Sequence, residues 1–275
     1  MGQFLKYKAD RLPILCVLLV FVFDLSVFVY SPWWGAVAWL LAGILPKSFI
    51  AAFNHHHQHL ATFGQPILNR LLEIVYGFQT GVTSQAWFLH HVIGHHRHYL
   101  DQEHDESRWA RADGSKMEPV EYSLSVAVTG YPRAFRAGTE FRHHQRLFVI
   151  MLLVQLTLLA GLFWWNWFNA LFVFLLPMAI SLYITAWHTY YHHAGLAVDD
   201  DMHASYNIIH PCYNRFTGNL GYHTAHHLRG GLHWSKLPDF HAEIAEQIPP
   251  HLYRRPCIPF RWIGKREVIA GSGTR

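Results

Sequence analysis

The chain has 275 residues, of which 51% are hydrophobic and only 15% are charged, as is typical of an integral membrane protein. The net charge of +4 is modest, and we find no basic domain or nucleic-acid motif, so a nucleic-acid partner is not expected. The three cysteines, Cys16, Cys212 and Cys257, form no CxxC pair, which argues against a disulfide framework and against thiolate metal ligation.

Four apolar stretches are long enough to cross a bilayer, which takes about 20 helical residues. Pro32 and several tryptophans mark the turns within two hairpins, as expected near a membrane interface. Asp24 and Lys47 are the only charges in these stretches, and we expect Asp24 to be a hydrogen-bonded structural residue. The predicted spans cover about residues 12–31, 33–53, 147–167 and 168–187.

The segments outside the hairpins are polar and rich in histidine. Apolar residues at helical spacing predict interfacial or site-capping helices over residues 66–89 and 120–135, whereas residues 101–119 are charged and predict a loop. Segments 54–146 and 188–270, together with the N-terminus, carry nearly all lysines and arginines, so the positive-inside rule places them in the cytoplasm. The sequence therefore predicts one all-α membrane domain over residues 1–275. It has four transmembrane helices, interfacial helices and a cytoplasmic histidine-rich cap.

The 23 histidines all lie at or after His55, and many gather in four clusters. Side chains three or four residues apart share one face of a helix. Ten histidines of these clusters are expected to point towards a common site. Ten imidazoles are more than the four ligands of a structural zinc, so we expect two metal ions. Imidazole suits iron, zinc, copper and nickel alike, so ligand type does not identify the metal. The candidate ligands are His55, His59, His91, His95, His96, His188, His192, His223, His226 and His227. His193 is left unassigned.

These motifs resemble those of the membrane-bound fatty acid desaturase and hydroxylase superfamily, over about residues 12–250. Three segments of this chain resemble the three histidine boxes of the family. They are His55-x3-His59 followed by Phe63, His91-x3-His95-His96 followed by Asp105, and His223-x2-His226-His227. The first box departs from the family pattern because His56 replaces an Asp. A further ligand segment, which reads NxxxHxxG in stearoyl-coenzyme A desaturases, is similar to His188-x3-His192-x2-Gly195.

The resemblance implies a non-haem pair of irons held by these histidines, with O2 as co-substrate. It also implies a separate electron donor of the ferredoxin, rubredoxin or cytochrome type. The implied reaction attacks unactivated C–H bonds of a fatty acyl chain, and desaturation is the favoured outcome. Hydroxylation, acetylene formation and alkene-forming decarboxylation use the same motifs and stay open.

A metal transporter is the alternative from another class. Transporters place ionisable residues near the bilayer midplane, whereas the predicted spans here contain no histidine. The candidates for binding an acidic head group or an electron donor are Arg97, Arg108, Arg111 and Trp109.

Overall fold

The computed structural model describes residues 4–196 and 198–256, and the regular elements in this part of the chain are all helical, which confirms the all-α class. The part of the predicted cytoplasmic segment 188–270 beyond residue 256 lies outside the described residues. The α-helices are α1 (Arg11–Tyr30), α2 (Trp33–His59), α3 (Pro66–Thr80), α4 (Pro119–Ala137), α5 (Arg142–Ala170), α6 (Leu176–His193), α7 (Pro211–Thr217), α8 (His223–Leu228) and α9 (Leu237–Ile244).

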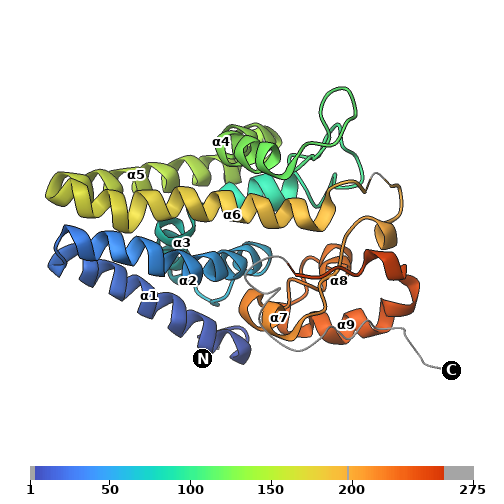
Figure 1. Cartoon of the computed structure of the whole chain (residues 1–275), viewed down its shortest axis with the longest axis horizontal. Helices are drawn as coiled ribbons and strands as arrows, with labels where there is room; N and C mark the ends of the chain where they lie inside the picture. The colour runs from blue at the N-terminus through green and yellow to red at the C-terminus, as the bar shows by residue number, and fades with distance from the viewer. Residues whose placement is uncertain (1–3, 197, 257–275) are drawn as a thin grey trace.

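Three helical stretches are long and apolar enough to cross a membrane: Lys8–Tyr30, Trp33–His59 and Arg142–His193. The third has 52 residues, and its backbone is not helical at Asn166, where φ is −149° and ψ is 90°. The chain reverses direction near the end of α5, and α6 leads back across the molecule (Figure 1). The turn between α1 and α2 lies at the same end of the molecule, and α7, α8 and α9 lie at the opposite end (Figure 1).

A buried ion pair joins the first two long helices. Lys47 Nζ lies 2.7 Å from Asp24 Oδ1, and both side chains are fully buried. Trp39 Nε1 donates to the same Asp24 oxygen, and Lys47 donates to the carbonyl of Val173 at 2.9 Å. Charges in an apolar interior persist when they are paired and hydrogen-bonded, so this pair fastens α1, α2 and the π-helical segment before α6 together.

Helices α3 and α4 are seen nearly end-on in Figure 1, crosswise to α1, α2, α5 and α6. The helix predicted over residues 120–135 corresponds to α4, which begins with a capping box between Glu118 and Glu121. The helix predicted over residues 66–89 is too long, because α3 ends at Thr80. Gly81 follows with φ of 70°, and a Cβ there would collide with the Met178 carbonyl of α6. The left-handed conformation of Gly81 therefore ends α3, and the Met178 carbonyl leaves no room for a side chain at this position.

Removing one member of the Asp24–Lys47 pair leaves the other charge buried without its partner. We expect Lys47→Met to lower the free energy of unfolding by about 3–5 kcal/mol, the usual cost of breaking a buried pair. The double variant Asp24→Leu/Lys47→Met recovers most of this loss, because no unpaired charge remains. Thermal unfolding in detergent micelles measures both effects. A single variant as stable as the parent protein would show that the pair does not fasten the helices.

Candidate metal centre

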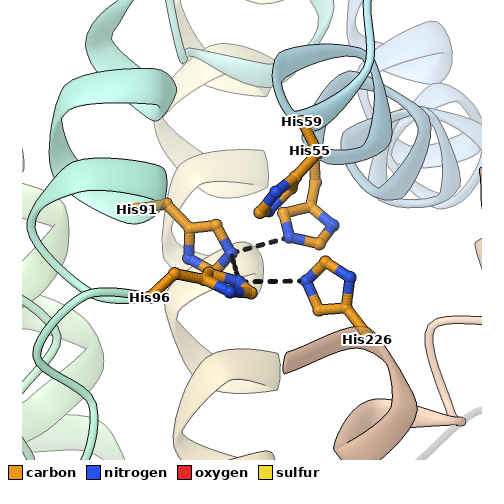
Figure 2. Close-up of side chains that lie close together, drawn as sticks. All are labelled: His55, His59, His91, His96 and His226. Atoms are coloured by element: carbon orange, nitrogen blue, oxygen red, sulfur yellow. Dashed lines mark hydrogen bonds between the residues drawn. The ribbon is translucent and has the colours of Figure 1, made fainter. Parts of the chain in front are cut away.

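Five imidazoles from three parts of the chain converge in a first histidine group (Figure 2). His55 Nε2 lies 2.7 Å from His91 Nε2, and His96 Nε2 lies 3.1 Å from both His91 Nε2 and His226 Nε2. His59 Nε2 is buried without a hydrogen-bond partner in the described part of the chain. The last turns of α2 supply His55 and His59, the segment after α3 supplies His91 and His96, and α8 supplies His226.

A second histidine group forms around His193, the last residue of α6. Its Nε2 lies 2.9 Å from His223 Nε2, 3.1 Å from His227 Nε2 and 3.2 Å from His95 Nε2. The two groups adjoin each other, because the rings of His96 and His227 stack with centroids 4.1 Å apart. Two centres of converging nitrogens therefore lie side by side.

Hydrogen bonds at the outer nitrogens determine what the inner nitrogens can do. His95 Nδ1 donates to the Asp105 carboxylate at 2.8 Å, His193 Nδ1 donates to the Ala204 carbonyl at 3.2 Å, and His223 Nδ1 donates to the Leu220 carbonyl at 3.3 Å. A neutral imidazole that is protonated at Nδ1 has a bare lone pair at Nε2. The Nε2 atoms of these three rings therefore present lone pairs to one another and form no hydrogen bond among themselves.

A metal cation relieves this repulsion. Two nitrogens that each lie about 2.1 Å from one ion are about 3.0–3.4 Å apart at angles of 90–109°. Most of the Nε2 separations in both groups fall near this range. The orphaned Nε2 of His59 also requires a partner. Because five imidazoles exceed the four ligands usual for a structural zinc, the first group suits a metal of higher coordination number.

Local backbone geometry brings the second histidine box to both groups. The segment Phe88–Ile93 is π-helical, and the N–H of His96 donates to the carbonyl of His91 at 2.8 Å, five residues back. In an α-helix, residues five apart point about 140° away from each other. The wider π turn instead lets His91 and His96 reach the first group, while His95 between them reaches the second.

Eight of the ten predicted ligands lie in the two groups, and His188 and His192 do not. His192 Nδ1 donates to the Tyr206 carbonyl at 2.9 Å, and its Nε2 lies 3.0 Å from the Tyr213 hydroxyl. Both nitrogens of His192 are thus occupied by protein atoms. The neighbouring residue, His193, lies in the second group instead. Two adjacent helical residues point about 100° apart, and the rotation of α6 decides which one faces the centre.

A cavity of about 1000 Å³ adjoins the centre between α2 and α6. Its walls include His55, His91 and His223 from the two groups, and His188 also lies on its wall. None of Arg97, Arg108, Arg111 and Trp109 lines this cavity. Arg111 instead forms an ion pair with Glu121. The basic residues that line the cavity are Lys116, Arg254 and Arg255. The sequence did not single them out as site residues, because they share no motif with the histidines.

Burial keeps four imidazoles of the centre neutral. Desolvation, followed by repulsion from neighbouring imidazoles, lowers the pKa of His91, His96, His226 and His227 well below the ordinary histidine value. Neutral imidazole is the form that binds metal, so these nitrogens are ready to act as ligands at neutral pH.

Comparison with known proteins gives one family. The sequence model described as fatty acid desaturase matches residues 31–258, which include every histidine of both groups. No curated protein and no solved structure gives a significant match.

The adjacent histidines at the end of α6 provide a matched pair of variants. We expect His193→Gln to lose at least half of the bound metal, because its Nε2 lies at the middle of the second group. His192→Gln should keep the metal content of the parent protein, since both His192 nitrogens bond to protein atoms. Elemental analysis of the purified variants measures the difference. Equal metal content in the two variants, or a loss confined to His192→Gln, would contradict the assignment.

The lowered histidine pKa values also predict how the metal-free protein responds to acid. Above pH 6.5 these groups are neutral in both the folded and the unfolded chain and contribute nothing to the pH dependence. Below that pH these histidines bind protons in the unfolded chain, whereas in the folded chain their lowered pKa values keep them unprotonated. Stability then falls by about 1.4 kcal/mol per group for each pH unit, down to the lowered pKa. The thermal midpoint should therefore drop between pH 7.5 and 5.5 and stay level between pH 7.5 and 8.5. A flat profile over the acidic range would argue against neutral buried imidazoles.

Proposed function

The chain belongs to the fatty acid desaturase family, and from this membership and its two histidine groups we propose that it introduces a double bond into a fatty acyl chain. The observation that carries the proposal is the convergence of imidazole nitrogens on two adjoining centres beside a cavity of about 1000 Å³. The family identifies an oxidoreductase with a lipid substrate, and the histidine groups supply a place for the metal that such chemistry requires.

The proposed metal ions are two irons, one in each histidine group. When bound, they would supply the power to activate O2 and to remove hydrogen from an unactivated C–H bond. The proposed ligands are His55, His59, His91, His96 and His226 in the first group and His95, His193, His223 and His227 in the second.

The overall reaction converts a saturated CH2–CH2 unit, O2, two electrons and two protons into an alkene and two waters. A separate ferredoxin, rubredoxin or cytochrome-type donor supplies the electrons. The protein's own residues bind the substrate and exclude water. Ala51, Ala52 and Trp87 provide apolar wall next to the cavity-lining histidines, so that an alkyl chain replaces water there. Asp105 keeps the proton of His95 on Nδ1, which leaves Nε2 of that ring available as a ligand.

The proposed orientation has four membrane spans: α1, α2, and the two halves of the stretch Arg142–His193 on either side of Asn166. A single straight helix of 52 residues would be about 78 Å long, far more than a bilayer requires. The histidine groups then lie at the cytoplasmic ends of α2 and α6, with both termini on the same side. This arrangement lets a soluble donor reach the centre while the substrate chain stays next to lipid.

Mass spectrometry of lipids and free acids from cells that express the protein tests the proposed reaction. We expect acyl chains two mass units lighter than in control cells, in an iron-dependent manner. His226→Ala should reduce this product at least 100-fold, because it removes a proposed ligand from the first group. The matched control is His104→Ala, since His104 is exposed and lies outside both groups. A gain of one oxygen would identify a hydroxylase and loss of CO2 a decarboxylase. Full activity of zinc-only protein would contradict the iron chemistry.

A further inference from the structure

The cavity beside the histidine groups is chemically different at its two ends. One end is lined by Ile44 and Leu45 of α2 and by Ile184 of α6. Leu45 lies ten residues before His55 on α2, which corresponds to about 15 Å along the helix. Lys116 and the segment 254–256, with Arg254 and Arg255, line the cavity near the C-terminal end of α6. Tyr190 there donates to the carbonyl of Met117, next to Lys116, and His192 donates to the carbonyl of Tyr206, whose ring lies against Arg254. The cavity therefore has apolar walls towards Ile184 and a basic mouth at the last turns of α6.

The cations at the mouth are held in place by the fold. The Arg254 guanidinium lies over the Tyr206 ring, 3.1 Å from its centroid, and the Arg254 N–H donates to the Asn207 carbonyl at 2.8 Å. Lys116 forms an isolated β-bridge with Ala110. Because the Arg254 side chain already lies on the Tyr206 ring, it loses less freedom when it binds a ligand.

The mouth contains too little negative charge to neutralise these cations. In the described part of the chain, neither Lys116 nor Arg254 has a carboxylate within ion-pair distance. Glu118 is the acidic residue on the cavity wall, and its side chain accepts a hydrogen bond from the first turn of α4. The mouth therefore keeps net positive charge that an anionic ligand would complement.

We propose that Lys116 and Arg254, together with Arg255, bind an anionic head group of the substrate, a carboxylate or a phosphate. The alkyl chain then runs past His55 and His223 towards Ile44. This inference rests on the proposed function, and it narrows the substrate to amphipathic anions. Alkanes, alkyl esters and other lipids with an uncharged head group are disfavoured, because they would make no charge-assisted contact with these exposed cations.

Binding to the metal-loaded protein in detergent micelles tests this inference without requiring turnover. Isothermal titration calorimetry compares three probes: palmitate, palmitoyl-coenzyme A and methyl palmitate. We expect methyl palmitate to bind at least tenfold more weakly than one or both of the anionic probes. A charge-assisted hydrogen bond typically contributes enough for a 10- to 150-fold difference in Kd. Preference for palmitate identifies a carboxylate site, and preference for palmitoyl-coenzyme A identifies a phosphate site.

Variants at the mouth complete the test. Lys116→Ala and Arg254→Ala should each weaken binding of the preferred anion about tenfold and leave methyl palmitate within twofold, whereas Lys116→Arg should retain anion binding. Arg215→Ala is the control, because Arg215 is exposed on α7 and does not line the cavity. The proposal is overturned if methyl palmitate binds as tightly as both anions, or if Lys116→Ala and Arg254→Ala bind them like the parent. Efficient turnover of a neutral substrate would overturn the head-group site while leaving the proposed oxidoreductase activity intact.

Discussion

Repulsion between unprotonated imidazole nitrogens is the interaction on which the rest of the structure depends. The outer nitrogens of His95, His193 and His223 bond to oxygen acceptors, so their inner nitrogens carry lone pairs that face one another. Without a cation, this arrangement has no stabilising contact at its centre and buries polar atoms at a cost. The fold must therefore hold the rings together by other means until metal binds, and metal binding in turn stabilises the fold.

Contacts outside the two histidine groups hold the elements that carry the rings in place. The Asp24–Lys47 pair fastens α1 and α2 within the apolar bundle, and the end of α2 carries His55 and His59 of the first group. At the other side, His233 and Trp234 both bond to Asp10, which ties the segment after α8 to the N-terminal end of the bundle. The histidines of α8 are thus fixed relative to those of α2. His233 is a structural link in this arrangement and does not contact either histidine group through its ring nitrogens.

Sequence spacing predicts which segments reach the centre better than it predicts which ring of each segment does so. Hydropathy finds the long helices, and the histidine motifs find eight of the ligand candidates. The choice of His193 over His192 depends on how α6 is rotated, and the contacts of His192 with Tyr206 and Tyr213 come from residues far along the chain. Such long-range contacts leave no periodic pattern in the sequence. The end of α3, by contrast, carries a sequence signal, because Gly81 takes the left-handed conformation that a glycine after a helix favours.

X-ray absorption spectroscopy of the iron-loaded protein, combined with its metal content, tests the central claim most directly. If the two histidine groups each hold an ion, the protein binds two irons per chain. The extended X-ray absorption fine structure then fits a shell of nitrogen atoms at about 2.1 Å, with the outer-shell scattering of imidazole rings. A single iron per chain, or a shell dominated by carboxylate oxygen or sulfur, would contradict the account.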